Sequence, residues 1–187
     1  PHCYSYLRWR QIHHIMILKV PGVIKIHKLR IIAIYESDLN LMLGNKWRAA
    51  MSEARRQGTL HPSQYGGCPG RDCQSVTLNK ELRRDYSLLT RTPMGSMEND
   101  ATAAYDRILM PISSLTARGY GIHRNVVLVH AKTLSEAVYK LRLSNKVAES
   151  EYSHCEKMPI HGSGQGSSNS PQIYTCLLYT SDAADDM

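Results

Sequence analysis

The sequence of 187 residues predicts an α+β fold. Residues 23–35 are rich in β-branched side chains and alternate in part between apolar and polar positions, which is typical of a strand or hairpin. Longer stretches after it repeat apolar residues at three- and four-residue steps, the period of an amphipathic helix. Because 42% of the residues are hydrophobic, the chain can form a packed core. Its longest apolar runs are far shorter than the ~18 residues that predict a membrane span, so no membrane partner is expected.

The strand-like segments are separated by clear turn signals. Residues 12–18 are apolar with two histidines inserted, and this pattern is compatible with a strand or a helix. Pro21 and Gly22 predict a turn before the strand-like run 23–35. Residues 151–160 predict a further strand or hairpin.

Helical patterns occupy four segments, namely 38–56, 76–89, 111–118 and 125–143. In the first, Asp38 is the expected N-cap and Gly58 follows the end. Pro111 suits the first turn of the third. In the second, four apolar residues share one face: Leu78, Leu82, Tyr86 and Leu89.

The positive charge of the chain is concentrated in its first third. The net charge is +7. Residues 1–60 hold ten Lys and Arg against three acidic residues, and the remaining residues balance. A basic region of this kind favours a polyanionic partner, most often nucleic acid. A solvated basic face explains the charge equally well.

The five cysteines do not form a disulfide pattern, because they are odd in number and irregularly spaced. Cys68 and Cys73, with His154 and Cys155, could be offered as a zinc knuckle. The adjacency of the second pair makes tetrahedral ligation awkward. Free thiols in a reducing, intracellular compartment are the preferred interpretation.

Two stretches carry residues suited to nucleotide chemistry. In 99–108, Asp100 is followed by small residues, then by Tyr105 and Asp106, so a ligand could approach the backbone beside a carboxylate that can hold Mg²⁺. In 164–171, flexible backbone carries amide and hydroxyl donors and enters a helix near Pro171, which suits sugar and phosphate contacts. Taken alone, Asp100 is also compatible with a helix N-cap, and 164–171 with a surface linker.

In this order along the chain, the stretches resemble the reverse transcriptases of non-LTR retrotransposons and group II introns. The Asp-x5-Asp pattern of 100–106 is similar to the first palm motif of that family, and Gln-Gly-x3-Ser-Pro at 165–171 is similar to the second. Residues 28–32 resemble the fingers segment whose arginine meets the incoming nucleotide, and 64–71 resemble a further stretch of the same enzymes. The resemblance covers roughly residues 20–175.

The resemblance implies roles for six residues in two-metal transfer of deoxynucleotides to a primer 3′-hydroxyl on an RNA template. Asp100 would be the catalytic, metal-binding carboxylate, with the Ala101 carbonyl as a second Mg²⁺ ligand. Arg30 would reach the triphosphate. Tyr105 would lie under the ribose and exclude a 2′-hydroxyl. The nucleotide pocket would be lined by Gln165 and Gly166. The resemblance leaves Asp106 a structural role, pairing with Arg107 or capping the next helix.

The same resemblance implies a right-hand polymerase with fingers at 1–90 and an incomplete palm at 91–175, and with the thumb absent. The chain does not begin with Met and is expected to be a fragment. Residues 176–187 are similar to a translated sequencing adaptor and are expected not to be native, although they include an Asp-Asp pair. Without the aromatic-x-Asp-Asp element of the palm, the chain as it stands is expected to be inactive.

Two other functions are compatible with these features. The chain could be a non-catalytic or decayed nucleic-acid-binding module of a mobile element. It could also be a viral RNA-templated RNA polymerase, but such enzymes accept a 2′-hydroxyl, which Tyr105 would exclude.

Overall fold

A four-stranded mixed sheet lies at one side of the molecule. The computed structural model describes residues 4–68, 70–96, 104–143, 146–154 and 162–175. The strands are β1 (Gln11–Leu18), β2 (Leu29–Ile34), β3 (Val138–Leu143) and β4 (Lys146–Ser153), in the order β2-β1-β3-β4. β1 is antiparallel to β2 and parallel to β3, and β3 and β4 form an antiparallel hairpin. The predicted α+β class is therefore confirmed, although no particular polymerase architecture follows from these strands.

The turn between β1 and β2 lies where Pro21 and Gly22 predict it. The Val23 amide donates a hydrogen bond of 3.2 Å to the Val20 carbonyl, and the Lys19 amide donates one of 3.1 Å to the Lys28 carbonyl. The ambiguous segment 12–18 is a strand, because β2 on one side and β3 on the other satisfy its backbone groups.

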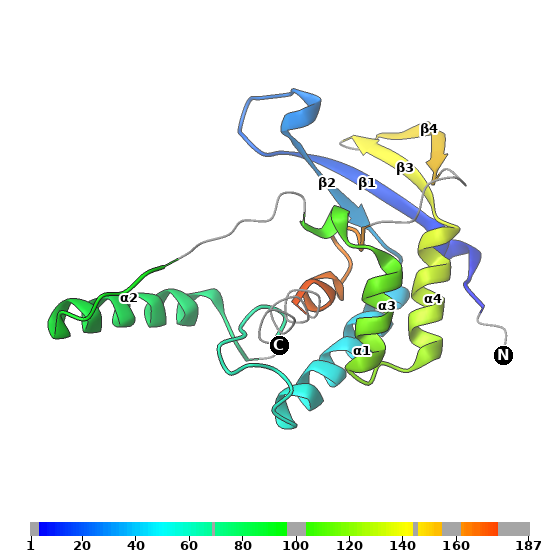
Figure 1. Cartoon of the computed structure of the whole chain (residues 1–187). Helices are drawn as coiled ribbons and strands as arrows, with labels where there is room; N and C mark the ends of the chain where they lie inside the picture. The colour runs from blue at the N-terminus through cyan, green and yellow to red at the C-terminus, as the bar shows by residue number, and fades with distance from the viewer. Residues whose placement is uncertain (1–3, 69, 97–103, 144–145, 155–161, 176–187) are drawn as a thin grey trace.

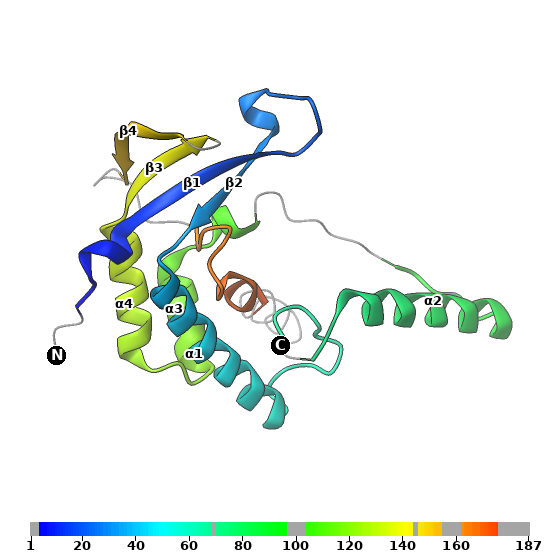
Figure 2. The ribbon, with the colours of Figure 1, turned by 180° about the vertical axis from the view of Figure 1, so that it is seen from behind.

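Helices cover one face of the sheet. Figures 1 and 2 show α1 (Ser37–Arg56), α3 (Met110–Gly119) and α4 (Arg124–Ser135) packed beneath it. A fifth helix begins at Ser170, and its described part covers 170–175. Side chains from the sheet and the helices together form the core under the sheet: Ile12, Ala33, Tyr139, Leu39, Leu43, Met110 and Leu134. None of the helices in the described ranges is long and apolar enough to cross a membrane.

Helix α1 confirms the period seen in the sequence, since Leu39, Leu43 and Trp47 are all buried. It begins at Ser37, and its N-cap is Glu36, two residues before the expected Asp38. The Asp38 carboxylate is engaged instead by the N-terminal segment: it accepts hydrogen bonds from Trp9 Nε1 at 2.9 Å and from Arg8. These hydrogen bonds lower the pKa of Asp38, although burial opposes the shift.

Helix α2 (Cys73–Thr90) includes the predicted second helix. Figures 1 and 2 show it extending away from the other helices, and none of its residues, all of which are described, is buried. Leu82 and Tyr86 are 55% and 67% exposed. The apolar face of α2 is therefore exposed, and no described element packs against it.

The predicted helix over 125–143 is two elements. Helix α4 ends at Ser135, and residues 138–143 form strand β3. Val138, Tyr139 and Lys140 pair with Gln11, Ile12 and His13 of β1, so the sheet overrides the helical period after Ser135. Strand β4 covers only the start of the predicted hairpin at 151–160, and residues 155–161 lie outside the described residues.

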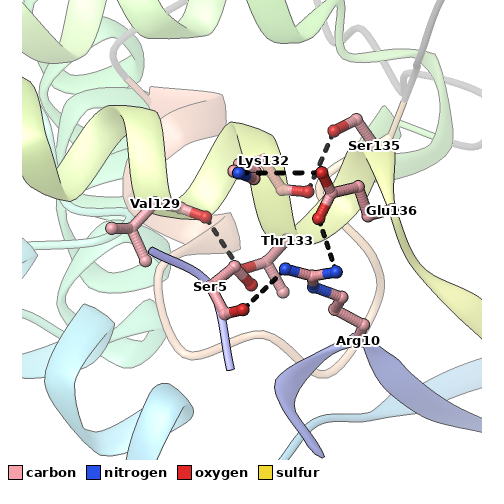
Figure 3. Close-up of polar contacts among 7 residues, drawn as sticks. All are labelled: Ser5, Arg10, Val129, Lys132, Thr133, Ser135 and Glu136. Carbon is pink, nitrogen blue, oxygen red and sulfur yellow. Dashed lines mark hydrogen bonds and ion pairs between the residues drawn. The ribbon is translucent and has the colours of Figure 1, made fainter. Parts of the chain in front are cut away.

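The N-terminal segment is held against α4 by a polar cluster. In Figure 3 the buried Ser5 hydroxyl meets the Thr133 hydroxyl at 2.8 Å, and Thr133 donates to the Val129 carbonyl at 2.8 Å. Arg10 donates to the Ser5 carbonyl at 2.7 Å and forms an ion pair of 2.8 Å with Glu136. These contacts join the start of β1 to the end of α4, and thereby place β1 and β3 side by side.

Candidate functional site

An open cavity of about 910 Å³ lies on the side of the sheet that faces the helices. We call it the central cavity. All four strands contribute to it, together with the 3₁₀ turn η3 (Ala104–Arg107) and the loop that precedes Ser170. Its polar and aromatic lining includes His14, Lys19, Arg30, Tyr35, Tyr105, Asp106, Tyr139, Tyr152, His154 and Gln165.

Three of the residues that the sequence assigns to nucleotide binding line this cavity. Arg30 comes from β2, Tyr105 from η3 and Gln165 from the loop, so three segments that are far apart in the chain meet at one place. Gly166 follows Gln165 in the same loop. Asp100 and Ala101, the predicted catalytic and metal-binding positions, lie outside the described residues.

The loop around Gln165 runs along the edge of β2. The Ala33 amide donates a hydrogen bond of 2.6 Å to the Gln165 carbonyl, and Asn40 Nδ2 of α1 donates one of 3.3 Å to the Gly166 carbonyl. Figure 1 shows this segment, in orange, beside the end of β2 and near η3. The backbone of the loop is therefore held by the sheet and by α1.

Only glycine fits at two positions of this loop. Gly164 and Gly166 have φ of +72° and +122°, a backbone conformation that residues with a side chain rarely adopt. A Cβ on Gly164 would lie 2.1 Å from the Tyr35 hydroxyl, and one on Gly166 would lie 2.1 Å from the Ala33 carbonyl oxygen. The glycine of the Gln-Gly pair is thus required by the close approach of two backbones.

The interior of the loop is held by buried polar side chains that sequence reasoning missed. Ser170 Oγ donates to the carbonyls of Ser163 and Gly164 at 3.0 and 2.9 Å. Asn169, fully buried, accepts from Ser167 and lies 3.5 Å from His130 Nδ1 of α4. Small polar residues in a loop give no sequence signal of this role, because their partners come from distant elements.

The described part of the first predicted motif, residues 104–106, lies next to the loop of the second. The amides of Gly162 and Ser163 donate to the carbonyls of Ile108 and Tyr105 at 2.7 and 2.9 Å. Gln165 Nε2 donates to the Asp106 carboxylate at 3.4 Å. Asp106 does not cap the following helix as proposed, since the N-cap of α3 is Leu109.

Tyr105 has two environments. It lines the central cavity. It also packs half-buried against a second core cluster, which includes Trp47, Met51 and Ile173, and its ring meets that of Tyr174 edge-on at 5.9 Å. The edge contact holds the ring in one place. Both the predicted role under the ribose and a role in the core agree with this position.

Burial sets the protonation of the residues deeper in the cavity. Burial raises the pKa of the Tyr35 hydroxyl, with smaller contributions from Tyr139 and Asp106. Burial, and then Tyr152, raises the pKa of Tyr139 to about 12. For His14, burial and then the charge of His154 lower the pKa. Tyr35, Tyr139 and His14 are therefore neutral near pH 7, and they share the lining with the charged side chains of Lys19, Arg30 and Asp106.

The described residues do not assemble a magnesium site. Within the described ranges, no group of three or more His, Cys, Asp or Glu side chains is placed to hold a metal ion. The carboxylate of Asp106 faces the Gln165 amide. Magnesium binding therefore stays a prediction on Asp100 and Ala101. Cys68 and Cys73, two of the residues considered for a zinc knuckle, are free thiols: Cys68 is buried in the core and Cys73 is exposed.

Comparisons of the chain with models of protein families and with curated proteins give no match. The resemblance to reverse transcriptases accordingly rests on the motifs and their order. The division into fingers at 1–90 and palm at 91–175 stays a prediction, and the sheet pairs β1 with β3 across these two ranges.

Proposed function

We propose that this chain is the nucleotide-binding part of an RNA-directed DNA polymerase of the retrotransposon and group II intron type, with the central cavity as its site for a deoxynucleoside triphosphate. One observation carries the proposal: Arg30, Tyr105 and Gln165, which separate motifs assign to the nucleotide, line a single cavity. A chance collection of motif-like segments gives no reason for three such residues to meet.

Each residue has a chemical part in this proposal. Arg30 and Lys19 bring positive charge to the cavity, and the planar guanidinium suits the oxygens of a triphosphate. The Tyr105 ring, held by Tyr174, would pack beneath C2′ of the sugar and leave no room for a hydroxyl. The Gln165 amide can hydrogen-bond to the nucleotide, because its backbone is held against β2.

Magnesium, expected at Asp100 and the Ala101 carbonyl, would supply the Lewis acidity of nucleotidyl transfer. Both residues lie outside the described part of the chain. The partners of the complete reaction would be an RNA template, a DNA primer and deoxynucleoside triphosphates.

Direct binding to the chain tests the proposal. We expect dTTP with Mg²⁺ to bind more tightly than its ribose counterpart, as measured by isothermal titration calorimetry. Tyr105→Val should bring the two affinities close together, because it removes the clash with the 2′-hydroxyl. Gln165→Ala should weaken both nucleotides alike.

The variant Arg30→Ala has a matched control in Arg83→Ala, on the exposed helix α2 and away from the cavity. Only the first should weaken triphosphate binding. A sugar preference that Tyr105→Val leaves unchanged would contradict the assignment of Tyr105. Binding of nucleic acid without any binding of nucleotides would favour the alternative of a non-catalytic module of a mobile element, for which the basic residues of 1–60 suffice.

A further inference from the structure

Four rings gather on the side of the central cavity formed by β1, β3 and β4, and none of them belongs to the nucleotide-binding motifs. We call them the ring cluster: His14, Tyr139, Tyr152 and His154. The sheet register brings them together, because Tyr139 pairs with Tyr152 across β3 and β4 and with Ile12 across β1, two residues before His14. Side chains two residues apart on a strand share a face.

The rings hold one another in place. Tyr139 and Tyr152 are stacked, with centroids 5.4 Å apart and an interplanar angle of 25°. His14 lies 4.6 Å from the Tyr139 ring, and its Nδ1 is hydrogen-bonded to the Tyr152 hydroxyl. The Tyr139 hydroxyl lies 3.0 Å from His154 Nε2. A ring held by a stacking contact and a hydrogen bond loses little further freedom when a ligand binds it.

The two tyrosines differ in their exposure. Tyr139 is 8% exposed and belongs to the core beneath the sheet. Tyr152 is 46% exposed, although one side of its ring lies on Tyr139. Core packing explains Tyr139, but it does not explain a large, oriented ring that stays open to a cavity.

We infer that Tyr152 is a stacking platform for an unpaired base of a nucleic-acid strand that enters the central cavity past Lys19 and Arg30. The cavity combines what such a strand needs: an oriented aromatic ring for a base, and cations for the phosphates on either side of it. The inference rests on the proposed function only for the source of the strand, which would be the RNA template.

The chemistry of the ring cluster favours a base over other ligands. The lowered pKa of His14 keeps the ring that is hydrogen-bonded to Tyr152 neutral near pH 7. Each base has a π face, so stacking of this kind tolerates any sequence. An acidic ligand without a ring would use Lys19 and Arg30 but would not depend on Tyr152.

Fluorescence anisotropy with a labelled single-stranded RNA tests the inference. Tyr152→Ala should weaken binding about tenfold, whereas Tyr152→Phe, which keeps the ring, should stay within about twofold of the parent chain. The matched control is Tyr86→Ala, an exposed tyrosine on α2 away from the cavity, which should change nothing. Circular dichroism on each variant checks that the fold is kept.

Salt dependence separates stacking from charge. Tyr152→Ala should leave the slope of log affinity against log salt unchanged, whereas Arg30→Ala should reduce it by about one. A single-stranded DNA of the same sequence should show the same dependence on Tyr152, because the ring contacts a base and not the sugar.

Three outcomes would overturn the inference: no binding of single strands by the parent chain, equal affinity in Tyr152→Ala, or an equal loss in Tyr152→Phe and Tyr152→Ala. Titration of dTTP into the same variants keeps the two proposals apart. If the chain binds no nucleotide but its strand affinity depends on the Tyr152 ring, the proposed polymerase function fails and the platform stands.

Discussion

The Ala33 amide donates a hydrogen bond of 2.6 Å to the Gln165 carbonyl, and this contact leaves no space beside the next residue. A Cβ on Gly166 would lie 2.1 Å from the Ala33 carbonyl oxygen. The loop that carries Gln165 into the cavity therefore depends on the edge of β2 and on a residue without a side chain.

We expect Gly166→Ala to lower the free energy of unfolding by ~1–3 kcal/mol or more, since this is the usual range for a strained backbone position. It should also weaken nucleotide binding, since the loop must leave β2. Chemical denaturation and calorimetry measure the two effects. The control is Gly95→Ala, where an added Cβ meets nothing within 4 Å. Equal stability of the two variants would contradict the close approach at Gly166.

The protonation of His130 should make the protein sensitive to acid. Burial lowers the pKa of His130 from 6.5 to about 4. Between these pH values the unfolded chain binds the proton more readily than the folded chain. The free energy of unfolding should therefore be fully retained above pH 6.5 and fall as the pH drops toward 4, by up to about 1.4 kcal/mol per pH unit.

Denaturation at several pH values checks this expectation with His130→Gln, which removes the titrating group. In that window, the free energy of unfolding of the variant should depend less on pH, by the contribution of about one bound proton. The control is His61→Asn, which replaces an exposed histidine in a loop. If His130→Gln keeps the full pH dependence of the parent, the dependence arises from other groups, and His130 is not its cause.

The buried hydroxyls in the polar cluster of Figure 3 should contribute to the free energy of unfolding. Thr133→Val leaves the Ser5 hydroxyl buried without its partner, which should cost about 1–3 kcal/mol of unfolding free energy. Ser5→Ala should cost less, because Thr133 keeps its hydrogen bond to the Val129 carbonyl. In the double variant the costs should not add. Ser135→Ala, at an exposed hydroxyl, is the control.

Stability should be distributed unequally between two helices with similar sequence patterns. Leu39 of α1 is fully buried, so Leu39→Ala should cost about 2–5 kcal/mol. Leu82 of α2 is 55% exposed, so Leu82→Ala should change the free energy of unfolding by at most about 0.5 kcal/mol. Thermal or chemical denaturation compares the two. A similar cost for both would mean that the apolar face of α2 is covered in solution.

Local patterns predicted several elements correctly for a definite reason. The apolar period of 38–56 and the proline at 111 act within one or two turns of helix, and α1 and α3 form where these signals lie. Pro21 and Gly22 likewise predict a turn that needs no distant partner. The sequence by itself also indicates three of the residues that line the central cavity, through motifs whose order along the chain is visible without a structure.

Only the tertiary structure decided the remaining features. Residues 138–143 continue a helical period, but they form β3 because β1 supplies their backbone partners. The ring cluster depends on a register between β1, β3 and β4 that no local pattern contains. Conversely, the apolar face of α2 has the period of a core helix, yet no described element packs against it. A local period indicates which side of an element is apolar, whereas burial and site geometry depend on segments far away in the chain, whose positions follow from packing and hydrogen bonding in three dimensions.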